Sequence, residues 1–340
     1  MKTKLSLCWI VAMFVVVNSY TQIVALHSSS GVQIIKGNAA LTTAYTAAEN
    51  GDTLYLSGHA FTLPATFDKQ LMIFGTGHYV DSTMATGKTF LTGNVTLSEN
   101  ADFFYLEGVE ITGKFIIATN HSVNNATIKR CKINGTFEAL GNASNPTKNL
   151  SLIGNVFLQR LTIENLQNAL ITNNIIVNTL QNTNGNLINN NIVMGYIWGS
   201  SMDYLLIGSN NIFNNNIFIW DGYNANVNGS GNVFNYNLYV EPTPNHGTAS
   251  TAIGNYTGIS QSDIFVNQTG VAFDYTHDYH LQSPTIYIGT DSTQVGIYGG
   301  VFPYKAGGVP SNPHIQMQNI APSTSNGLLN VQINAAAQDE

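Results

Sequence analysis

The chain has 340 residues, of which 44% are hydrophobic and only 9% are charged, and its formal net charge is −7. This length suits one large solenoid or two ordinary domains. The acidic balance argues against nucleic acid or an anionic membrane surface as a partner.

Residues 1–22 have the pattern of a secretory signal peptide. Two lysines precede an apolar run over Leu5–Val17, and a polar end follows. The run is short for a membrane helix, and no later apolar stretch is longer. We therefore expect a protein without a membrane span that is secreted or held at the extracellular surface. Removal of this leader takes two of the 12 basic residues and none of the 19 acidic ones, which leaves a net charge of −9.

The segment after the leader predicts a cap and the first strands. Leu41, Ala44 and Ala48 recur at helical spacing, which predicts a short amphipathic helix over Leu41–Asn50. Such a helix would cover the open first coil of a solenoid, whose bare end exposes unpaired strand edges. Alternating apolar residues then predict strands at Thr53–Leu56, Leu71–Phe74 and Phe90–Leu97.

One pattern recurs seven times between Phe104 and Val240. Each copy holds two short runs rich in Ile, Val, Leu and Phe, separated by a polar corner, and the copies begin 17 to 25 residues apart. A period near 20 residues indicates a solenoid, and the runs are too short for helices. One corner position reads Val109, Cys131, Asn155, Asn174, Asn191, Asn216 and Asn237.

The repeat predicts an all-β fold, a single-stranded right-handed parallel β-helix (a solenoid) with a short N-terminal capping helix and a C-terminal β tail. Connections between parallel strands are normally right-handed. Stacked Asn side chains can hydrogen-bond from coil to coil, and Asn tolerates the left-handed backbone of a sharp corner. Cys131 remains alone after the leader is removed, and we expect it to be a buried small apolar residue.

The end of the repeat is marked by two prolines, Pro242 and Pro244, which cannot sit in a central strand. We expect coils to resume at Ile264–Val266 and to end near Gly300, so that the β-helix spans residues 36–300. The remaining 301–340 form a tail with strands near Ile315–Gln318 and Leu329–Ile333. We expect this tail to shield the last coil, and a separate docking element is the alternative.

Two groups of phrases carry a family resemblance. AAENGDTLYLSGHAFTLP, LMIFGTG and FFYLEGVEITG resemble the opening coils of the pectate-lyase-like right-handed parallel β-helix superfamily, and SDIFVNQTG with DYHLQSPTIYIGTDSTQVGIYGG resembles its closing coils. That superfamily includes polysaccharide lyases, glycoside hydrolases and secreted members without assigned activity. The leader and the tail resemble those of secreted Bacteroidetes-type proteins. The phrases are structural, so the resemblance bears on fold more than on activity.

A charged group offers the first candidate for chemistry. Lyases of the resembled family use Lys or Arg as a base and hold calcium with acidic groups, which would give that role to Lys129, Arg130 or Lys132. The repeat supplies a structural alternative, because Glu107 stands at the position of Lys129 one coil on, and Glu110 at that of Lys132. We favour the structural ladder, to which Lys114 and Arg160 would also belong by their shared repeat position.

Two other groups are candidates for binding. Asp274, His277, Asp278 and His280 could ligate a metal, but no third strong ligand is evident, and we expect a structural turn, no metal site and no cofactor, with Ca²⁺ only in a lyase. Trp198 and Trp220 lie one coil apart and could form a sugar platform with nearby aromatic and acidic residues. The alternative is that these rings pack on the core. The other platform residues are Asp203, Tyr204, Asp221 and Tyr223.

The catalytic motifs of the polygalacturonase-like members, Asn-x-Asp, Asp-Asp, Gly-His-Gly and Arg-x-Lys, do not occur in this sequence. We therefore expect a secreted, monomeric protein that binds extracellular polysaccharide or cell-surface glycan without catalysis. Two alternatives stay open, a polysaccharide lyase acting on uronic-acid polymers and a structural or adhesive cell-surface protein.

Overall fold

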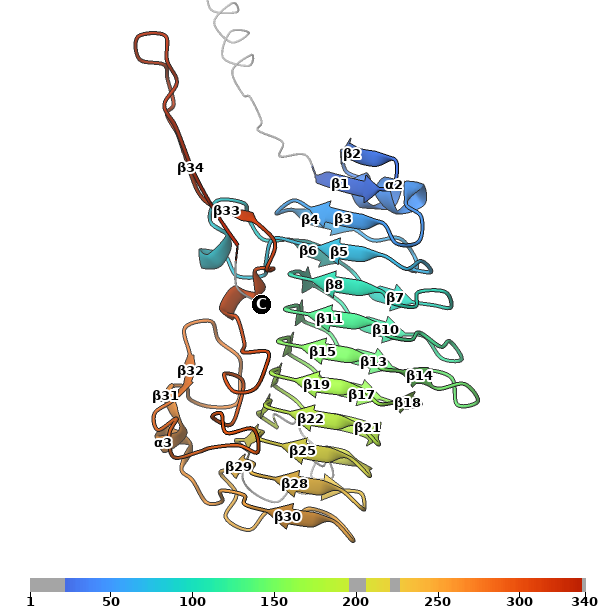
Figure 1. Ribbon diagram of the computed structural model, residues 1–340, viewed down its shortest axis with the longest axis vertical. Coiled ribbons are helices and arrows are strands. Elements are labelled where there is room, and N and C mark those ends of the chain that lie inside the picture. Colours follow the sequence, from blue (N-terminus) through green and yellow to red (C-terminus); the bar gives the residue numbers. More distant parts are fainter. Residues whose placement is uncertain (1–21, 196–205, 221–226, 338–340) are drawn as a thin grey trace, which may run out of the picture.

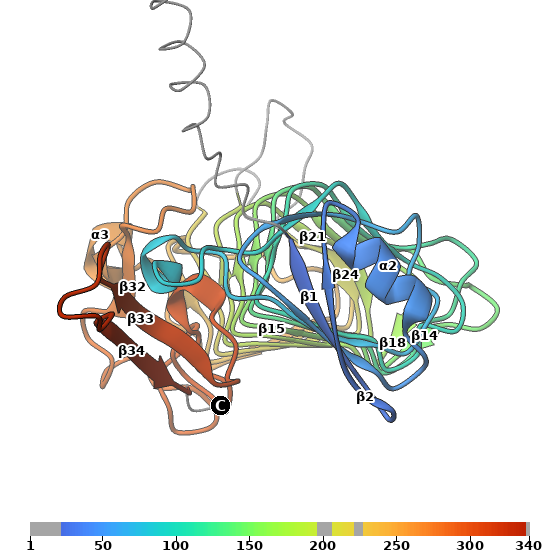
Figure 2. The ribbon, with the colours of Figure 1, turned by 90° about the horizontal axis from the view of Figure 1, so that it is seen from above.

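The computed structural model describes residues 22–195, 206–220 and 227–337 of the chain (Figures 1 and 2). Within these residues most strands stack in parallel into three long sheets, which confirms the predicted all-β solenoid. Sheet A contains β1 (Ile23–Ser28), β2 (Gly31–Lys36), β3 (Thr53–Leu56), β5 (Met72–Phe74), β8 (Tyr105–Glu107), β11 (Thr127–Lys129), β15 (Ser151–Ile153), β19 (Leu170–Thr172), β22 (Leu187–Asn189), β25 (Ile212–Asn214), β28 (Val233–Asn235) and β30 (Thr251–Ile253).

Sheets B and C form the other two sides of the solenoid. Sheet B contains β4 (Ala60–Thr62), β6 (Phe90–Thr92), β9 (Glu110–Ile111), β12 (Lys132–Ile133), β16 (Val156–Phe157), β20 (Ile175–Ile176), β23 (Ile192–Val193), β26 (Ile217–Phe218) and β29 (Leu238–Tyr239). Sheet C contains β7 (Val95–Leu97), β10 (Phe115–Ile117), β13 (Phe137–Ala139), β17 (Leu161–Ile163), β21 (Leu180–Asn184), β24 (Leu206–Ser209) and β27 (Val227–Asn228). The short strands β14 (Thr147–Lys148) and β18 (Leu166–Gln167) pair beside them.

The core lies inside the coils because alternate residues of each short strand point inward. In the three-residue strands of sheet A from β5 to β28 the middle residue is buried, and Leu106, Ile128 and Leu152 stand in register on successive coils. Phe115 stacks on Phe137 in sheet C with ring centroids 4.8 Å apart. The outward first residue of strands β5, β8, β15 and β19 is exposed or half-buried, whereas the outward last residue of each is buried.

The predicted corner column is confirmed as a ladder of buried Asn side chains. Asn174 donates from its backbone N–H and from Nδ2 to Oδ1 of Asn191, both at 2.9 Å, and Asn191 does the same toward Asn216. Asn255 extends the ladder by one coil beyond the predicted column. The residue before each ladder position has a positive φ, which is the left-handed corner that the sequence predicts.

A second ladder runs along another corner, and the sequence analysis missed it. The backbone N–H groups of Ala169, Asn186 and Asn211 donate to the side-chain oxygens of Asn186, Asn211 and Asn232 respectively. Ser250 accepts from the N–H of Asn232 and ends this ladder. The later coils are therefore joined at two corners by side-chain amides, in addition to the sheet hydrogen bonds.

The first coil is capped as predicted. Helix α2 (Ala40–Ala47) buries Ala40, Leu41 and Ala44 against the open end of the solenoid. Strands β1 and β2 form an antiparallel hairpin that pairs with β3, so β2 is the edge of sheet A. No helix in the described part of the chain is long and apolar enough to cross a membrane.

The chain after β30 differs from the expectation that coils resume at Ile264. Helix α3 (Gln261–Ile264) leads into β31 (Phe265–Asn267), which pairs antiparallel with β32 (Asp278–Leu281) in a separate sheet. The sheets therefore stack for about nine turns in the described residues. One more stacked strand, β30, follows the two prolines, and the chain leaves the solenoid only after it.

Residues 283–310, named the strap here, run back along the corner of sheet A toward the first coils (Figure 1). Asn215 contacts Thr290, and Asn190 donates to Gly296 O at 3.3 Å. Asn173 donates to Ile297 O and Gly299 O, at 2.9 and 2.7 Å. The strap continues through a short 3-10 turn, η2 (Ala306–Gly308), close to a second one, η1 (Asp81–Thr83), in the loop before β6.

The tail forms the two predicted strands, β33 (His314–Ile320) and β34 (Val331–Ala336), as an antiparallel hairpin. Its predicted role as a shield of the last coil is wrong. The start of the hairpin lies beside the first coils, where His314 and Ile315 line a hollow with Tyr55 and Phe74. The strap carries the tail to the opposite end of the solenoid, which the sequence pattern does not reveal.

Candidate functional site

The charged group of the early coils is held together by buried ion pairs. The predicted register of Lys129 opposite Glu107 is confirmed, but the ion pair to Glu107 is made by Arg130, at 3.1 Å. The side chains of Arg130 and Glu107 are 5% and 1% exposed, and the Tyr105 hydroxyl donates to the same carboxylate at 2.6 Å. Arg130 also donates to Val309 O, so it fastens the strap.

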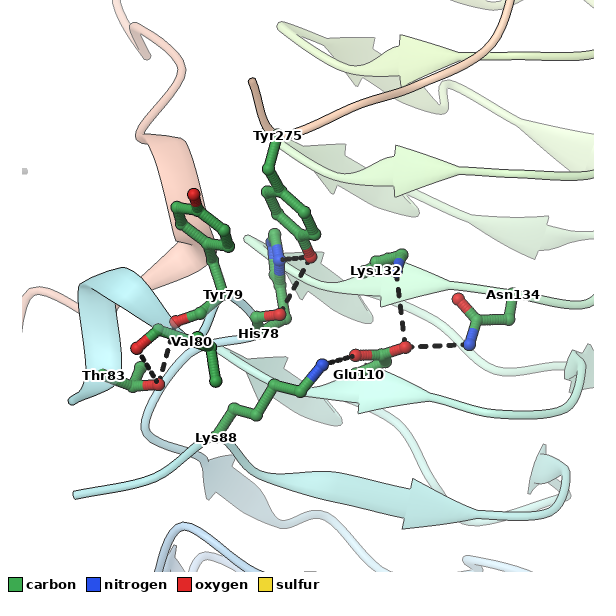
Figure 3. A network of polar contacts seen from close by, with 9 residues as sticks. All are labelled: His78, Tyr79, Val80, Thr83, Lys88, Glu110, Lys132, Asn134 and Tyr275. Atoms are coloured by element: carbon green, nitrogen blue, oxygen red, sulfur yellow. Dashed lines mark hydrogen bonds and ion pairs between the residues drawn. The ribbon is translucent and has the colours of Figure 1, made fainter. Parts of the chain in front are cut away.

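Glu110 accepts hydrogen bonds from three side chains of neighbouring coils (Figure 3). Lys132 stands opposite it as predicted, at 3.4 Å, while Lys88 and Asn134 approach to 2.9 Å. Burial alone would raise the pKa of Glu110, but the hydrogen bonds from Asn134 and Lys88 and the charge of Lys132 outweigh it, so the pKa is lowered. Lys88 was not identified from the sequence because it precedes the clear repeats.

His78 lies fully buried beside this cluster and anchors the distant Tyr275 (Figure 3). The Tyr275 hydroxyl donates to His78 O and lies 2.8 Å from Nδ1 of the imidazole. Because a phenol has one proton, Nδ1–H donates to the Tyr275 oxygen, and Nε2 is left as a buried acceptor without a partner. Burial, with the nearby positive charge of Lys132, lowers the pKa of His78 to about 3.

These contacts give the basic residues structural partners. Arg130 and Lys132 are tied to carboxylates, and Lys114 pairs with Glu138 at 2.8 Å. A general base for a lyase must be free to approach substrate, which a buried and paired Arg130 is not. Of the three candidates, Lys129 and Arg130 line a narrow hollow together with Lys305, and Arg130 is already paired with Glu107. The geometry therefore favours the structural interpretation of the early charged group.

The segment around His277 forms a local turn. Asp274 accepts from the backbone and side chain of Thr276, and His280 pairs with Asp278 at 2.6 Å while stacking on Tyr298. Within the described residues, no three His, Cys, Asp or Glu side chains come together in a way that could hold a metal ion.

The predicted aromatic platform falls largely outside the described residues. Trp198, Asp203 and Tyr204 belong to 196–205, and Asp221 and Tyr223 to 221–226. Trp220 is described: it is half-buried, it packs against the core, and its indole N–H is buried without a partner.

A different aromatic surface was missed, on the outward face of sheet A. Tyr55 stacks on Phe74 with centroids 5.4 Å apart, and Phe74 contacts Tyr105 at 5.3 Å. Tyr55 and Phe74 stand in register on successive coils, and Tyr105 on the next coil contacts Phe74 diagonally, because Tyr105 lies opposite Met72. We name these three rings the ring column. Tyr55 and Phe74 line a hollow of about 260 Å³ that is closed on its other side by Pro310 and the start of β33.

The same face is hollowed further along, across β19, β22 and β25. Its floor is an apolar column of Leu170, Leu187 and Ile212, in register on three coils. Two hollows of about 380 and 300 Å³ meet at Leu170 on this face. The first extends toward the starts of the strands and the second toward their ends. The second is walled by the strap, and Asn189 in its lining has a buried side-chain oxygen without a partner. We name this floor and its strap wall the trough.

The trough is lined mainly by apolar and amide or hydroxyl groups. Asp291 of the strap is the one charged residue among the described residues that line its two hollows. Asn235 donates to Asn214 at 3.1 Å in the column next to the apolar floor. Such a surface offers hydrogen bonds without ionic attraction, beside aliphatic groups that can cover an apolar ring face.

No protein-family model, no curated protein and no solved structure matches this chain. The fold and the surface chemistry are therefore the only basis for assigning a function.

Proposed function

We propose that this protein binds a neutral extracellular polysaccharide along the outward face of sheet A and does not cleave it. The observation that carries the proposal is the trough, where an uncharged floor of Leu170, Leu187 and Ile212 is bordered by amides and by the strap. Sugar rings present apolar faces and hydroxyl edges, which match an apolar column beside hydrogen-bonding side chains.

The length of the face supports a polymer over a small sugar. The ring column of Tyr55, Phe74 and Tyr105 lies on the same side of sheet A as the trough, several coils away. A chain of sugar units could contact both regions, and Tyr55 would stack on one ring near the strap. The partner that we propose is neutral because the protein is acidic and because Lys88, Arg130 and Lys132 of the early coils are already paired with carboxylates.

The proposal includes secretion and ancestry. The leader at 1–22 supports export, and the phrases that resemble coils of pectate-lyase-like β-helix proteins support membership of that superfamily. The leader and the tail support a Bacteroidetes-type origin. Glycan binding at the Trp198 and Trp220 region remains a further proposal, and Trp220→Ala tests it in the same assay.

Affinity electrophoresis tests the proposal. Gels containing neutral polymers such as xylan, mannan or β-glucan should retard the protein, and gels containing pectate or alginate should not. Leu187→Lys places a charge on the trough floor and should weaken retention about tenfold or more. Ile116→Lys is the matched control, because Ile116 is also a half-buried outward aliphatic residue, on sheet C. Retention by no polymer, or equal losses in both variants, would refute the proposal.

A lyase acting on uronic-acid polymers is the second candidate, favoured by one observation. Lys129 and Lys305 line the same narrow hollow between β11 and the strap, close to Arg130. Ca²⁺ would be its expected cofactor by family resemblance. This candidate predicts ultraviolet-absorbing unsaturated products from pectate or alginate, and their loss in Lys129→Ala. If incubation with these polymers yields no such product, the lyase candidate is refuted.

A further inference from the structure

The C-terminal hairpin leaves the body of the protein, and beyond its base, where His314 and Ile315 line a hollow, both of its faces are uncovered. In Figure 1, β33 and β34 project past the first coils, and in Figure 2 they lie beside the solenoid and not on it. Nearly every residue of the two strands is exposed. An isolated two-stranded hairpin is only marginally stable in water, so a covering surface would stabilise it.

The register gives the hairpin one apolar face. Residues directly opposite each other in an antiparallel pair point to the same side. Ile320 lies opposite Val331, and Ile333 lies opposite Gln318, two residues further along. These three apolar side chains are 54%, 47% and 60% exposed, in the order Ile320, Val331 and Ile333. They form an aliphatic stripe that nothing in the described chain covers.

A bulge extends this stripe toward the base of the hairpin. The pairing shifts between Ile315 and Met317, so Ile315 lies opposite Ala335 and joins the apolar face. Without the shift, alternation would place Ile315 on the other face together with Met317. That other face carries Gln332 and Asn334. The bulge therefore makes one face of the hairpin richer in aliphatic residues than the other, with Gln318 on the first face and Met317 on the second.

The hairpin is also free of charge. No Asp, Glu, Lys or Arg occurs between Lys305 and Asp339, although the chain as a whole is acidic. Two copies of an acidic protein repel each other where their charged surfaces meet. An uncharged, projecting segment is where two such copies can approach, whereas a partner that is recognised by its charge would find no counter-charge there.

We propose that the apolar face of this hairpin packs against the same face of a second copy, which forms a dimer with two-fold symmetry. An isologous interface needs a self-complementary patch, and an aliphatic stripe without charges meets that requirement. Two faces of this length would bury on the order of 1,000 Å², at the low end of specific interfaces, so association is weak, in the micromolar range. The inference replaces the monomer expected from sequence and is independent of glycan binding.

Sedimentation velocity of the purified protein over a concentration series tests the dimer. The unmodified protein should pass from monomer to dimer as its concentration rises through the micromolar range. Ile333→Lys puts a charge on the apolar face and should weaken association at least about tenfold. Gln332→Lys is the matched control, because it adds the same charge to the neighbouring residue of the same strand on the opposite face, and it should leave association unchanged.

Far-ultraviolet circular dichroism of both variants should match that of the unmodified protein, because the hairpin lies outside the stacked coils. A protein that stays monomeric up to roughly 100 μM would overturn the proposal. Equal weakening by Gln332→Lys and Ile333→Lys would overturn it as well, since it would indicate pairing through a strand edge and not through the apolar face.

Discussion

The early and later coils place different types of residue at the same corner position. At Val109 and Cys131 the corner position is apolar and buried, whereas from Asn155 to Asn255 it is an amide that bonds the next coil. The hydrogen bonds to the strap differ in the same way. Near the first coils they come from Arg130 and His78, and further along they involve Asn173, Asn190 and Asn215.

The difference shows where charge is used in this solenoid. The early coils hold their strap with buried ion pairs and a neutral His, whose free energies depend on pH and on complete pairing. The later coils rely on amides, whose hydrogen bonds are insensitive to pH. The floor of the trough lies on the later coils and is uncharged, so it is separate from the ion pairs of the early coils.

The largest expected effect is at the buried ion pair of the early coils. Arg130→Ala leaves Glu107 buried without its cation, and we expect the free energy of unfolding to fall by about 3–5 kcal/mol. Adding Glu107→Gln to that variant should recover part of the loss, because the uncompensated charge is then gone. Calorimetric unfolding of the two variants measures both values. A cost below about 1 kcal/mol for Arg130→Ala would show that the pair is not desolvated.

The next effect is in the later ladder. Asn191→Ala removes the acceptor of two donors from Asn174 and the donor to Ile171 O, all in the interior. We expect a loss of about 3 kcal/mol, since buried groups are left without partners. Native-state hydrogen exchange at the Asn174 amide reports it directly. Asn235→Ala, on the outward face of sheet A, is the control and should cost less than about 1 kcal/mol.

The pH dependence of stability separates the two regions. The unfolded chain protonates His78 below about pH 6.5, but the folded one does so only near its pKa of about 3. The contribution of neutral His78 to the free energy of unfolding is therefore fully present above pH 6.5. It falls by about 1.4 kcal/mol per pH unit as pH decreases toward 3. His78→Gln should flatten this slope relative to the unmodified protein. An identical slope in both proteins would show that His78 is protonated in the fold.

The smallest effect is predicted at the junction of the two regions. Burial raises the pKa of the Cys131 thiol to about 12, and the Cys131 N–H already donates to Asn155 Oδ1 at 2.9 Å. Cys131→Asn would extend the ladder by one coil, because its amide could donate to Leu106 O, which Sγ approaches to 3.7 Å. We expect a change within about 1 kcal/mol, against a clear loss for Cys131→Asp. Thermal unfolding of the two variants decides this.

The column from Val109 to Asn237 could be predicted from sequence because a fixed corner recurs with each coil, and the structure confirms its register. Asn255 was missed because the prolines before it hide the repeat. The pairing of Glu107 could not be predicted in detail, since Arg130 adopts a left-handed φ of 52° and reaches the carboxylate in place of Lys129. An Arg residue in the sequence does not indicate a left-handed backbone conformation.

The site was harder to predict than the fold for a physical reason. The trough and the ring column combine residues from successive coils with the strap, and the strap has no periodicity that would place it. Its course depends on contacts such as Asn215 to Thr290, 75 residues apart in the chain. Lys88 was missed for the same reason, because a loop residue acquires its partner only through folding.

Hydrogen exchange of the protein with and without a retained neutral polysaccharide tests the proposed function most directly. The account predicts slower exchange of amides in β19, β22 and β25 and in strap residues 290–302, with no change in sheet C. Protection confined to sheet C, or to the region around Trp220, would contradict it.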